Sequence, residues 1–152
     1  MSEDLSAGSP IGPYRVVAPL EEGGMASLYL AHRPPSKDIV AVKIIRSRLR
    51  DDSSVIRMFQ DEARTLTFVR HPNVVRVLDA GESEGERYLA MEYLHGCSLA
   101  RLVDELDRRE VPLPVEVVAH LGVEVAEALH AAHHAVDDEA KPLAIVHRDV
   151  SP

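Results

Sequence analysis

The stretch Ile39-Val40-Ala41-Val42-Lys43-Ile44-Ile45 sets the expectation for the whole chain. It is too short for a buried helix and rich in β-branched residues, so it predicts a central β-strand. Side chains alternate along a strand, which places Lys43 on one face with Ile39, Ala41 and Ile45. Burying an unpaired ammonium is very costly, so Lys43 must either extend to water or meet an anion. The strand alone favours extension to water.

The composition predicts a globular domain in which any phosphate-binding site is local. The chain has 152 residues, of which 45% are hydrophobic, enough for one domain with a core. A formal net charge of -8 argues against a broad basic face for nucleic acid or anionic lipid. The single cysteine, Cys97, excludes an internal disulfide and fits a reducing compartment, so we expect a cytoplasmic protein. The sequence shows neither a signal peptide nor an apolar run of membrane-spanning length.

The first thirty residues predict a leader followed by a hairpin. Residues 1–13 carry Ser, Gly and Pro with little apolar content, so we expect a flexible leader before structure begins near Tyr14. Two glycines, Gly23 and Gly24, then separate two apolar segments of strand character. This pattern fits a β-hairpin with a glycine tip, although a lone Gly-Gly pair more often marks only a turn.

A helix is predicted after the central strand, because the apolar spacing changes to three and four residues. Its stripe consists of Ile56, Phe59, Ala63 and Leu66. One serine of Ser53-Ser54 could cap it, and Pro72 ends it. Glu62 lies on or beside the apolar stripe, an unusual place for a carboxylate. Two further strands are expected over 74–78 and 87–93.

The remainder of the chain is predicted to be helical. Helices are expected over about 99–108 and 115–135, and the second has an apolar stripe. Its members are Val118, Leu121, Val125, Leu129 and Ala132. Strands with one inserted helix, followed by helices, predict an α+β fold in two parts, with the change near 94–96.

Several motifs, in this order, resemble the N-terminal portion of a bacterial-type protein Ser/Thr kinase. They are the glycine loop at 20–31, Ala41-Val42-Lys43, a helix with Glu62, His71-Pro72-Asn73, Met91-Glu92-Tyr93-Leu94 and His147-Arg148-Asp149. Each motif is weak alone, but the ordered set is specific and covers about residues 14–152. The resemblance implies a kinase-like N-terminal lobe over 14–94, with a five-stranded antiparallel sheet and one helix. Residues 95–152 would supply the hinge, two helices and the start of the catalytic loop of an incomplete C-terminal lobe.

The resemblance also implies an ATP site. The catalytic residues would be Lys43, which contacts the α and β phosphates, Glu62, which holds Lys43, and Asp149, which orients the substrate hydroxyl and accepts its proton. The ATP-binding residues would be Leu20, Gly23, Gly24, Leu28, Ala41, Lys43, Met91, Glu92 and Leu94. A regulatory stack would comprise Leu66, Val77 and His147, although ordinary core packing explains these three equally well. Glu62 thus supplies the anion that turns Lys43 from an awkward strand residue into a phosphate anchor.

The implied ligands are ATP and Mg2+, and the implied partners are a protein substrate or the rest of the C-terminal lobe. The chain also departs from the family pattern. Glu21 and Ala26 stand where the family has glycines, and Ser151 stands where a lysine usually touches the γ-phosphate. The family's magnesium ligands are an asparagine five residues after Asp149 and an Asp-Phe-Gly motif, and neither is among the 152 residues. Histidines 130, 133 and 134 have helical spacing, but no carboxylate or cysteine completes a metal set, so no metal site is predicted within the chain.

Two functions therefore stay open. The first is an ATP-dependent protein Ser/Thr kinase, of which this chain is an N-terminal fragment. The second is a non-catalytic kinase-like module that binds nucleotide weakly or binds a protein partner. In either case we expect the 152 residues alone to be inactive in phosphoryl transfer.

Overall fold

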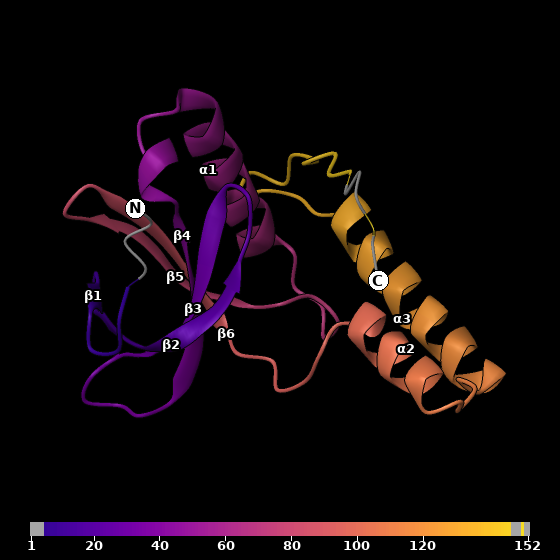
Figure 1. Ribbon diagram of the computed structural model, residues 1–152. Helices are drawn as coiled ribbons and strands as arrows, with labels where there is room; N and C mark the ends of the chain where they lie inside the picture. The colour runs from indigo at the N-terminus through magenta and orange to yellow at the C-terminus, as the bar shows by residue number, and fades with distance from the viewer. Residues whose placement is uncertain (1–4, 147–149, 151–152) are drawn as a thin grey trace. The chain divides into compact units, whose positions relative to one another are not determined.

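The structure, a computed structural model, describes residues 5–146 and residue 150. The contacts within the chain divide it into two units. The first unit comprises residues 1–67 and 75–93, and the second comprises residues 68–74 and 94–152. The first unit holds the sheet, and the second holds two helices (Figure 1).

The first unit is built around one antiparallel sheet, which has six strands within the described residues. Their order is β1-β2-β3-β4-β6-β5, so β4 lies between β3 and β6. The strands are β1 Pro10–Ile11, β2 Tyr14–Glu22, β3 Ala26–His32, β4 Ile39–Ile45, β5 Val77–Ser83 and β6 Glu86–Glu92. A short 3-10 helix, Ser47–Leu49, and helix α1, Ser53–Phe68, follow β4. The prediction of a central strand over 39–45 is thus confirmed.

The expected number of strands, five, is wrong by one. The additional strand, β1, lies inside the segment 1–13 that we expected to be a flexible leader. Ile11 pairs with Tyr14 of β2, and its side chain is only 1% exposed. A single buried isoleucine gives no periodic signal in a segment rich in Ser, Gly and Pro, so the sequence did not reveal this strand.

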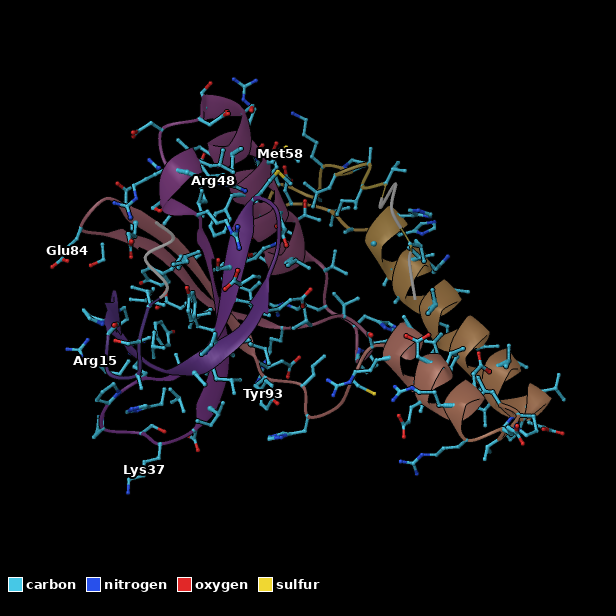
Figure 2. The ribbon with its side chains drawn as sticks, in the orientation of Figure 1. Arg15, Lys37, Arg48, Met58, Glu84 and Tyr93 are labelled. Atoms are coloured by element: carbon cyan, nitrogen blue, oxygen red, sulfur yellow. The ribbon has the colours of Figure 1, made fainter. Side chains whose placement is uncertain are left out.

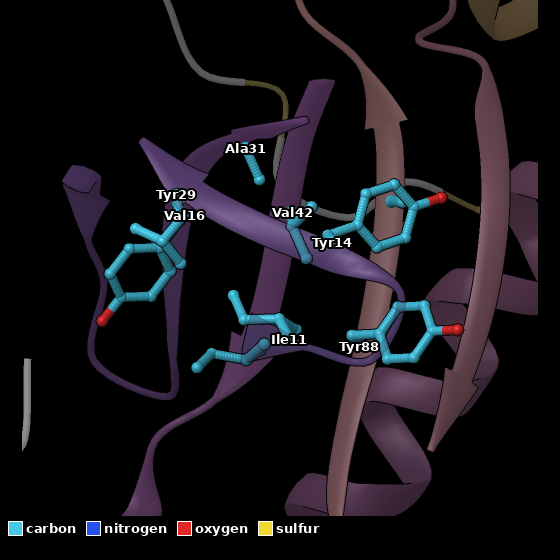
Figure 3. Packing of buried hydrophobic residues seen from close by; sticks show 9 residues of the cluster. Ile11, Tyr14, Val16, Tyr29, Ala31, Val42 and Tyr88 are labelled. Carbon is cyan, nitrogen blue, oxygen red and sulfur yellow. The ribbon is translucent and has the colours of Figure 1, made fainter. Parts of the chain in front are cut away.

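Two buried clusters occupy the two faces of the sheet. The first contains Ile11, Tyr14, Val16, Tyr29, Ala31, Val42, Ile44, Tyr88 and Ala90 (Figure 3). The second contains Ile45, Val55, Phe59, Leu89 and Met91, and it joins α1 to the sheet. Alternation along β4 sends Val42 and Ile44 to the first cluster and Ile45 to the second. Lys43 therefore lies on the face that α1 covers.

Helix α1 begins one residue later than its cap. The cap is Asp52 and not the expected serine, because Asp52 Oδ1 accepts hydrogen bonds from the N–H groups of Ser54 at 2.9 Å and Val55 at 3.3 Å. Strands β5 and β6 occupy residues 77–83 and 86–92 instead of the expected 74–78 and 87–93. The hairpin between them turns at Glu84-Gly85, two residues with positive φ of 53° and 79°. Such a two-residue turn needs left-handed backbone, which Gly85 adopts without a steric cost.

The second unit contains α2, Leu99–Arg108, and α3, Val115–His133. The range predicted for α2 is confirmed, and α3 ends two residues earlier than expected. Asn73 anchors residues 68–74 to α3, because its side-chain amide donates hydrogen bonds to the carbonyl and the carboxylate of Glu124. Val118 and Val125 of the predicted apolar stripe are 50% and 45% exposed. None of the helices in the described residues is long and apolar enough to cross a membrane.

Candidate functional site

An ion pair between Lys43 and Glu62 forms the centre of the candidate site. The Lys43 ammonium donates to both carboxylate oxygens of Glu62, at 2.6 Å to Oε1 and 2.7 Å to Oε2. Lys43 comes from the central strand and Glu62 from α1, so the pair forms only when the helix packs on the sheet. The side chains are 28% and 41% exposed, which leaves the pair in contact with solvent. Lys43 has therefore met an anion, as the motif set predicted and the strand alone did not.

A cavity of about 360 Å³ opens beside this pair in the first unit. It is lined by Glu21, Gly23, Gly24, Met25, Ala26, Ser27, Leu28, Lys43, Glu62 and Met91. Strand register explains the grouping, because Leu28 pairs with Lys43 across β3 and β4, and Ala41 pairs with Met91 across β4 and β6. The cavity thus has a hairpin tip on one side, a cation on another and a buried methionine behind them.

Most of the predicted first-unit site residues meet at this cavity. The structure brings together Gly23, Gly24, Leu28, Lys43, Glu62 and Met91. Leu20, Ala41 and Glu92 are not among the lining residues, although Ala41 is buried next to Met91. Leu94 belongs to the second unit, and its side chain is 64% exposed.

The backbone at the end of β6 is already partly engaged. The Glu92 N–H donates to the Arg76 carbonyl at 3.0 Å, and the Arg76 N–H donates to Glu92 Oε1 at 2.8 Å. These two hydrogen bonds hold the strand end against the segment that precedes β5. The Glu92 N–H is consequently not free to contact a ligand.

The remaining predicted residues divide into two groups. Leu66 and Val77 pack against the cluster that joins α1 to the sheet, so their positions suit ordinary core packing. His147 and Asp149 lie outside the described residues. Among the residues that the structure describes, no group of three or more His, Cys, Asp or Glu side chains could hold a metal ion.

Two arginines that the sequence does not single out lie beside the hairpin tip. Arg48 Nη2 donates to the Gly24 carbonyl at 3.0 Å, and Arg46 Nη2 donates to Glu22 Oε2 at 2.8 Å. Nothing in the sequence separates these arginines from others on the surface, because their partners lie more than twenty residues away.

This arrangement can hold a polyanion. A fixed ammonium, a glycine turn with accessible backbone and apolar walls are the groups that bind a nucleotide phosphate chain beside its base. The charge is local, which agrees with the net negative charge of the whole chain.

Comparison with known proteins identifies the family to which the chain belongs. The family described as "Protein kinase domain" matches residues 14–152. The chain is 36% identical over 146 residues to the tyrosine-protein kinase MasK of Myxococcus xanthus, covering 94% of this chain and 23% of MasK. It is 34% identical over 139 residues to a probable serine/threonine-protein kinase of Clostridium perfringens, covering 91% of this chain and 18% of that protein.

A solved structure supports the fold as well. The crystal structure of the Mycobacterium tuberculosis PknI kinase domain matches with a TM-score of 0.77 at 30% identity, covering 98% of this chain and 55% of that chain. The chain therefore spans about a fifth of these curated relatives and about half of this kinase domain. With residues 14–152 matched by the family, this chain belongs to the protein kinase domain family.

Proposed function

We propose that this chain forms the ATP-binding part of a protein serine/threonine kinase, which transfers the γ-phosphate of ATP to a protein hydroxyl. The single observation that carries the proposal is the Lys43–Glu62 ion pair at the edge of the cavity. Phosphoryl transfer depends on positioning and charge neutralisation, and a lysine held by a helix glutamate supplies a fixed cation for the phosphates.

In this proposal Lys43 binds the α and β phosphates, and Glu62 orients the ammonium. Gly23 and Gly24 allow the hairpin backbone to approach the phosphate chain, because they add no side chain there. Leu20, Leu28, Ala41 and Met91 enclose the adenine ring. The backbone of Leu94 and the carbonyl of Glu92 read the adenine edge, since the Glu92 N–H already donates to Arg76.

Asp149 would orient the substrate hydroxyl and accept its proton. When bound, Mg2+ would neutralise phosphate charge, although no group of three or more His, Cys, Asp or Glu side chains in the described residues could hold the ion. The acceptor is proposed to be Ser or Thr, although MasK is named a tyrosine kinase. A cytoplasmic location would give such an enzyme access to ATP.

A second candidate is a non-catalytic kinase-like module that binds nucleotide or a protein partner. The observation that favours it is sequence chemistry: Glu21, Ala26 and Ser151 replace the glycines and the lysine of the family pattern. Reading the coding frame past codon 152 separates the two candidates. An asparagine five residues after Asp149 and a downstream Asp-Phe-Gly motif support the kinase.

The experiment that tests the proposed ATP site is a calorimetric titration of the 152-residue chain with ATP. We expect saturable binding that Lys43→Met weakens strongly and that Arg64→Ala does not change. Arg64 is the matched control, because it is an exposed cation of α1 whose side chain has no partner among the described residues. No binding by the unaltered chain, or equal binding by the Lys43→Met chain, would contradict the proposal.

A phosphoryl-transfer assay tests the expectation that the 152 residues alone are inactive. The 152-residue chain should bind ATP without labelling a generic basic protein from radioactive ATP. Robust labelling that Asp149→Asn abolishes would show that these residues suffice for catalysis and would overturn this expectation.

A further inference from the structure

The tip of the β2–β3 hairpin, residues 22–26, is tied to the segment that follows β4. Three hydrogen bonds make the connection. The Arg46 N–H donates to the Met25 carbonyl at 3.1 Å, the Arg46 guanidinium donates to Glu22 Oε2 at 2.8 Å, and the Arg48 guanidinium donates to the Gly24 carbonyl at 3.0 Å. Figure 2 shows Arg48 at the end of the sheet where this hairpin turns. The carbonyls of Gly24 and Met25 thus both accept hydrogen bonds from the short segment 46–48.

The ties also orient the backbone donors of the tip. A trans peptide group points its N–H opposite to its C=O. Because the carbonyls of Gly24 and Met25 point to the arginines, the N–H groups of Met25 and Ala26 point away from them. Met25 and Ala26 both line the cavity, so their two oriented N–H groups lie in the cavity wall. Successive oriented N–H groups favour an anion.

Without these ties the tip would have little to hold it. Residues 22–25 are exposed. Within the tip itself, the Gly23 N–H donates a backbone hydrogen bond to the Ala26 carbonyl at 2.9 Å. A Cβ added to Gly24 would have no neighbouring atom within 4 Å, so the turn is open at this residue. Exposed hairpin tips with few contacts are mobile, and ordering a mobile loop reduces binding affinity.

We propose that Arg46 and Arg48 are positioning residues that hold the hairpin tip in the conformation that receives the phosphate chain of ATP. This inference rests on the proposed function, since it assigns a role to residues next to the proposed ATP site. The arginines act through the carbonyls of Gly24 and Met25 and the carboxylate of Glu22, and neither arginine lines the cavity itself. Their effect should be confined to the phosphates, because the proposed function places the phosphate chain, and not the adenine ring, against the tip.

The charge arrangement separates this role from that of an ordinary surface pair. The Arg46 side chain is 19% exposed and the Glu22 side chain is 51% exposed, so their ion pair by itself adds little to stability. Arg48 is itself exposed, so replacing it should leave the folded unit intact and loosen only the tip. This expectation makes the proposal testable by ligand binding rather than by unfolding.

The test compares the unaltered chain with Arg48→Ala, Arg48→Lys and the control Arg64→Ala. Each chain is titrated with ATP and with adenosine, and backbone 15N relaxation reports the order of the Met25 and Ala26 amides. For Arg48→Ala we expect a rise in the Kd for ATP of about three- to tenfold, the size of one ordinary net hydrogen bond, because this exposed bond acts on the ligand only through the order of the tip. The Kd for adenosine should not change, and Arg48→Lys should restore ATP binding, because lysine still donates to the Gly24 carbonyl. The order parameters of the two amides should fall from about 0.85 toward 0.6.

A charge reversal tests Arg46 in the same way. Arg46→Glu alone should weaken ATP binding, and Arg46→Glu combined with Glu22→Arg should restore it, since the pair is re-formed with opposite polarity. An equal loss of ATP and adenosine binding would overturn the proposal, because it would indicate general damage to the site. Unchanged order parameters in Arg48→Ala would overturn it too. If the unaltered chain binds no ATP, the proposed function fails, and the order parameters then decide the role of Arg48 by themselves.

Discussion

Removing the charge of Lys43 should weaken ATP binding by an amount that follows from its hydrogen bonds. An ammonium has three N–H donors, and two of them go to Glu62 at 2.6 and 2.7 Å, so one remains for a phosphate oxygen. A hydrogen bond between charged groups contributes about 1.5–3 kcal/mol. Losing it in Lys43→Met should therefore raise the Kd for ATP about 10- to 150-fold.

The partner carboxylate makes the prediction sharper. In Lys43→Met the Glu62 carboxylate remains beside the triphosphate without its counter-charge, and like charges repel. The double variant Lys43→Met/Glu62→Gln removes this repulsion, so it should bind ATP more tightly than Lys43→Met alone. Folding should be little affected, because a pair this exposed contributes about 0.2–1 kcal/mol to the free energy of unfolding.

The assay is calorimetric titration of the four chains of this cycle with ATP, and with adenosine as the control ligand. Urea unfolding of the same chains checks that the free energy of unfolding stays within about 1 kcal/mol. Adenosine affinity should be equal in all four, since it carries no phosphate. Unchanged ATP affinity in Lys43→Met would refute the reasoning and show that the ammonium does not contact the phosphates. A double variant that binds no better than Lys43→Met would refute the role assigned to Glu62.

Three further predictions concern stability. Gly81→Ala should lower the free energy of unfolding in urea by about 1–3 kcal/mol, because the added Cβ would lie 2.7 Å from Tyr88 Oη and 2.9 Å from Cζ of that buried ring. Burial, followed by the negative charge of Asp79, raises the pKa of Tyr14 and of Tyr88. These folded pKa values exceed the unfolded value of about 10. The stability that the two phenols contribute is therefore present below about pH 10 and is lost as pH rises through the folded pKa. Tyrosinate absorbance and urea unfolding, both measured from about pH 9 to 12, should show this loss. Asp52→Ala should lower the urea midpoint at neutral pH by removing the cap of α1, and this difference should shrink as pH falls through the pKa of Asp52, which hydrogen bonds from Ser54 hold below its ordinary value.

Matched variants control these three measurements. Gly24→Ala should leave the free energy of unfolding unchanged, because the added Cβ would have no neighbouring atom within 4 Å. If Gly24→Ala destabilises the chain as much as Gly81→Ala does, the clash with Tyr88 is not the cause of the Gly81→Ala effect. Tyr88→Phe should flatten the alkaline loss of stability. Asp52→Asn should keep the cap at both neutral and acid pH, since its amide oxygen accepts the same hydrogen bonds.

The sequence by itself determined the elements whose signals are local or ordered along the chain. Alternation in 39–45 identified the central strand, and the helix expected over 99–108 coincides with α2. The family motifs named Lys43 and Glu62 as partners before any contact was known, because their order reports a shared chemistry. The lysine pattern alone had favoured extension to water.

The tertiary structure decided the contacts between segments far apart in sequence. It brought Lys43 within 2.6 Å of Glu62, and it recruited Ile11 as a strand residue from a segment that carries no strand pattern. It also placed Arg46 and Arg48 on the hairpin tip, although both resemble other surface arginines in sequence. Such contacts depend on strand register and helix packing, which a local pattern of residues does not encode. The predicted anchor could thus be named from the sequence, whereas the ties that position the loop above it appear only when β2, β3 and β4 are paired.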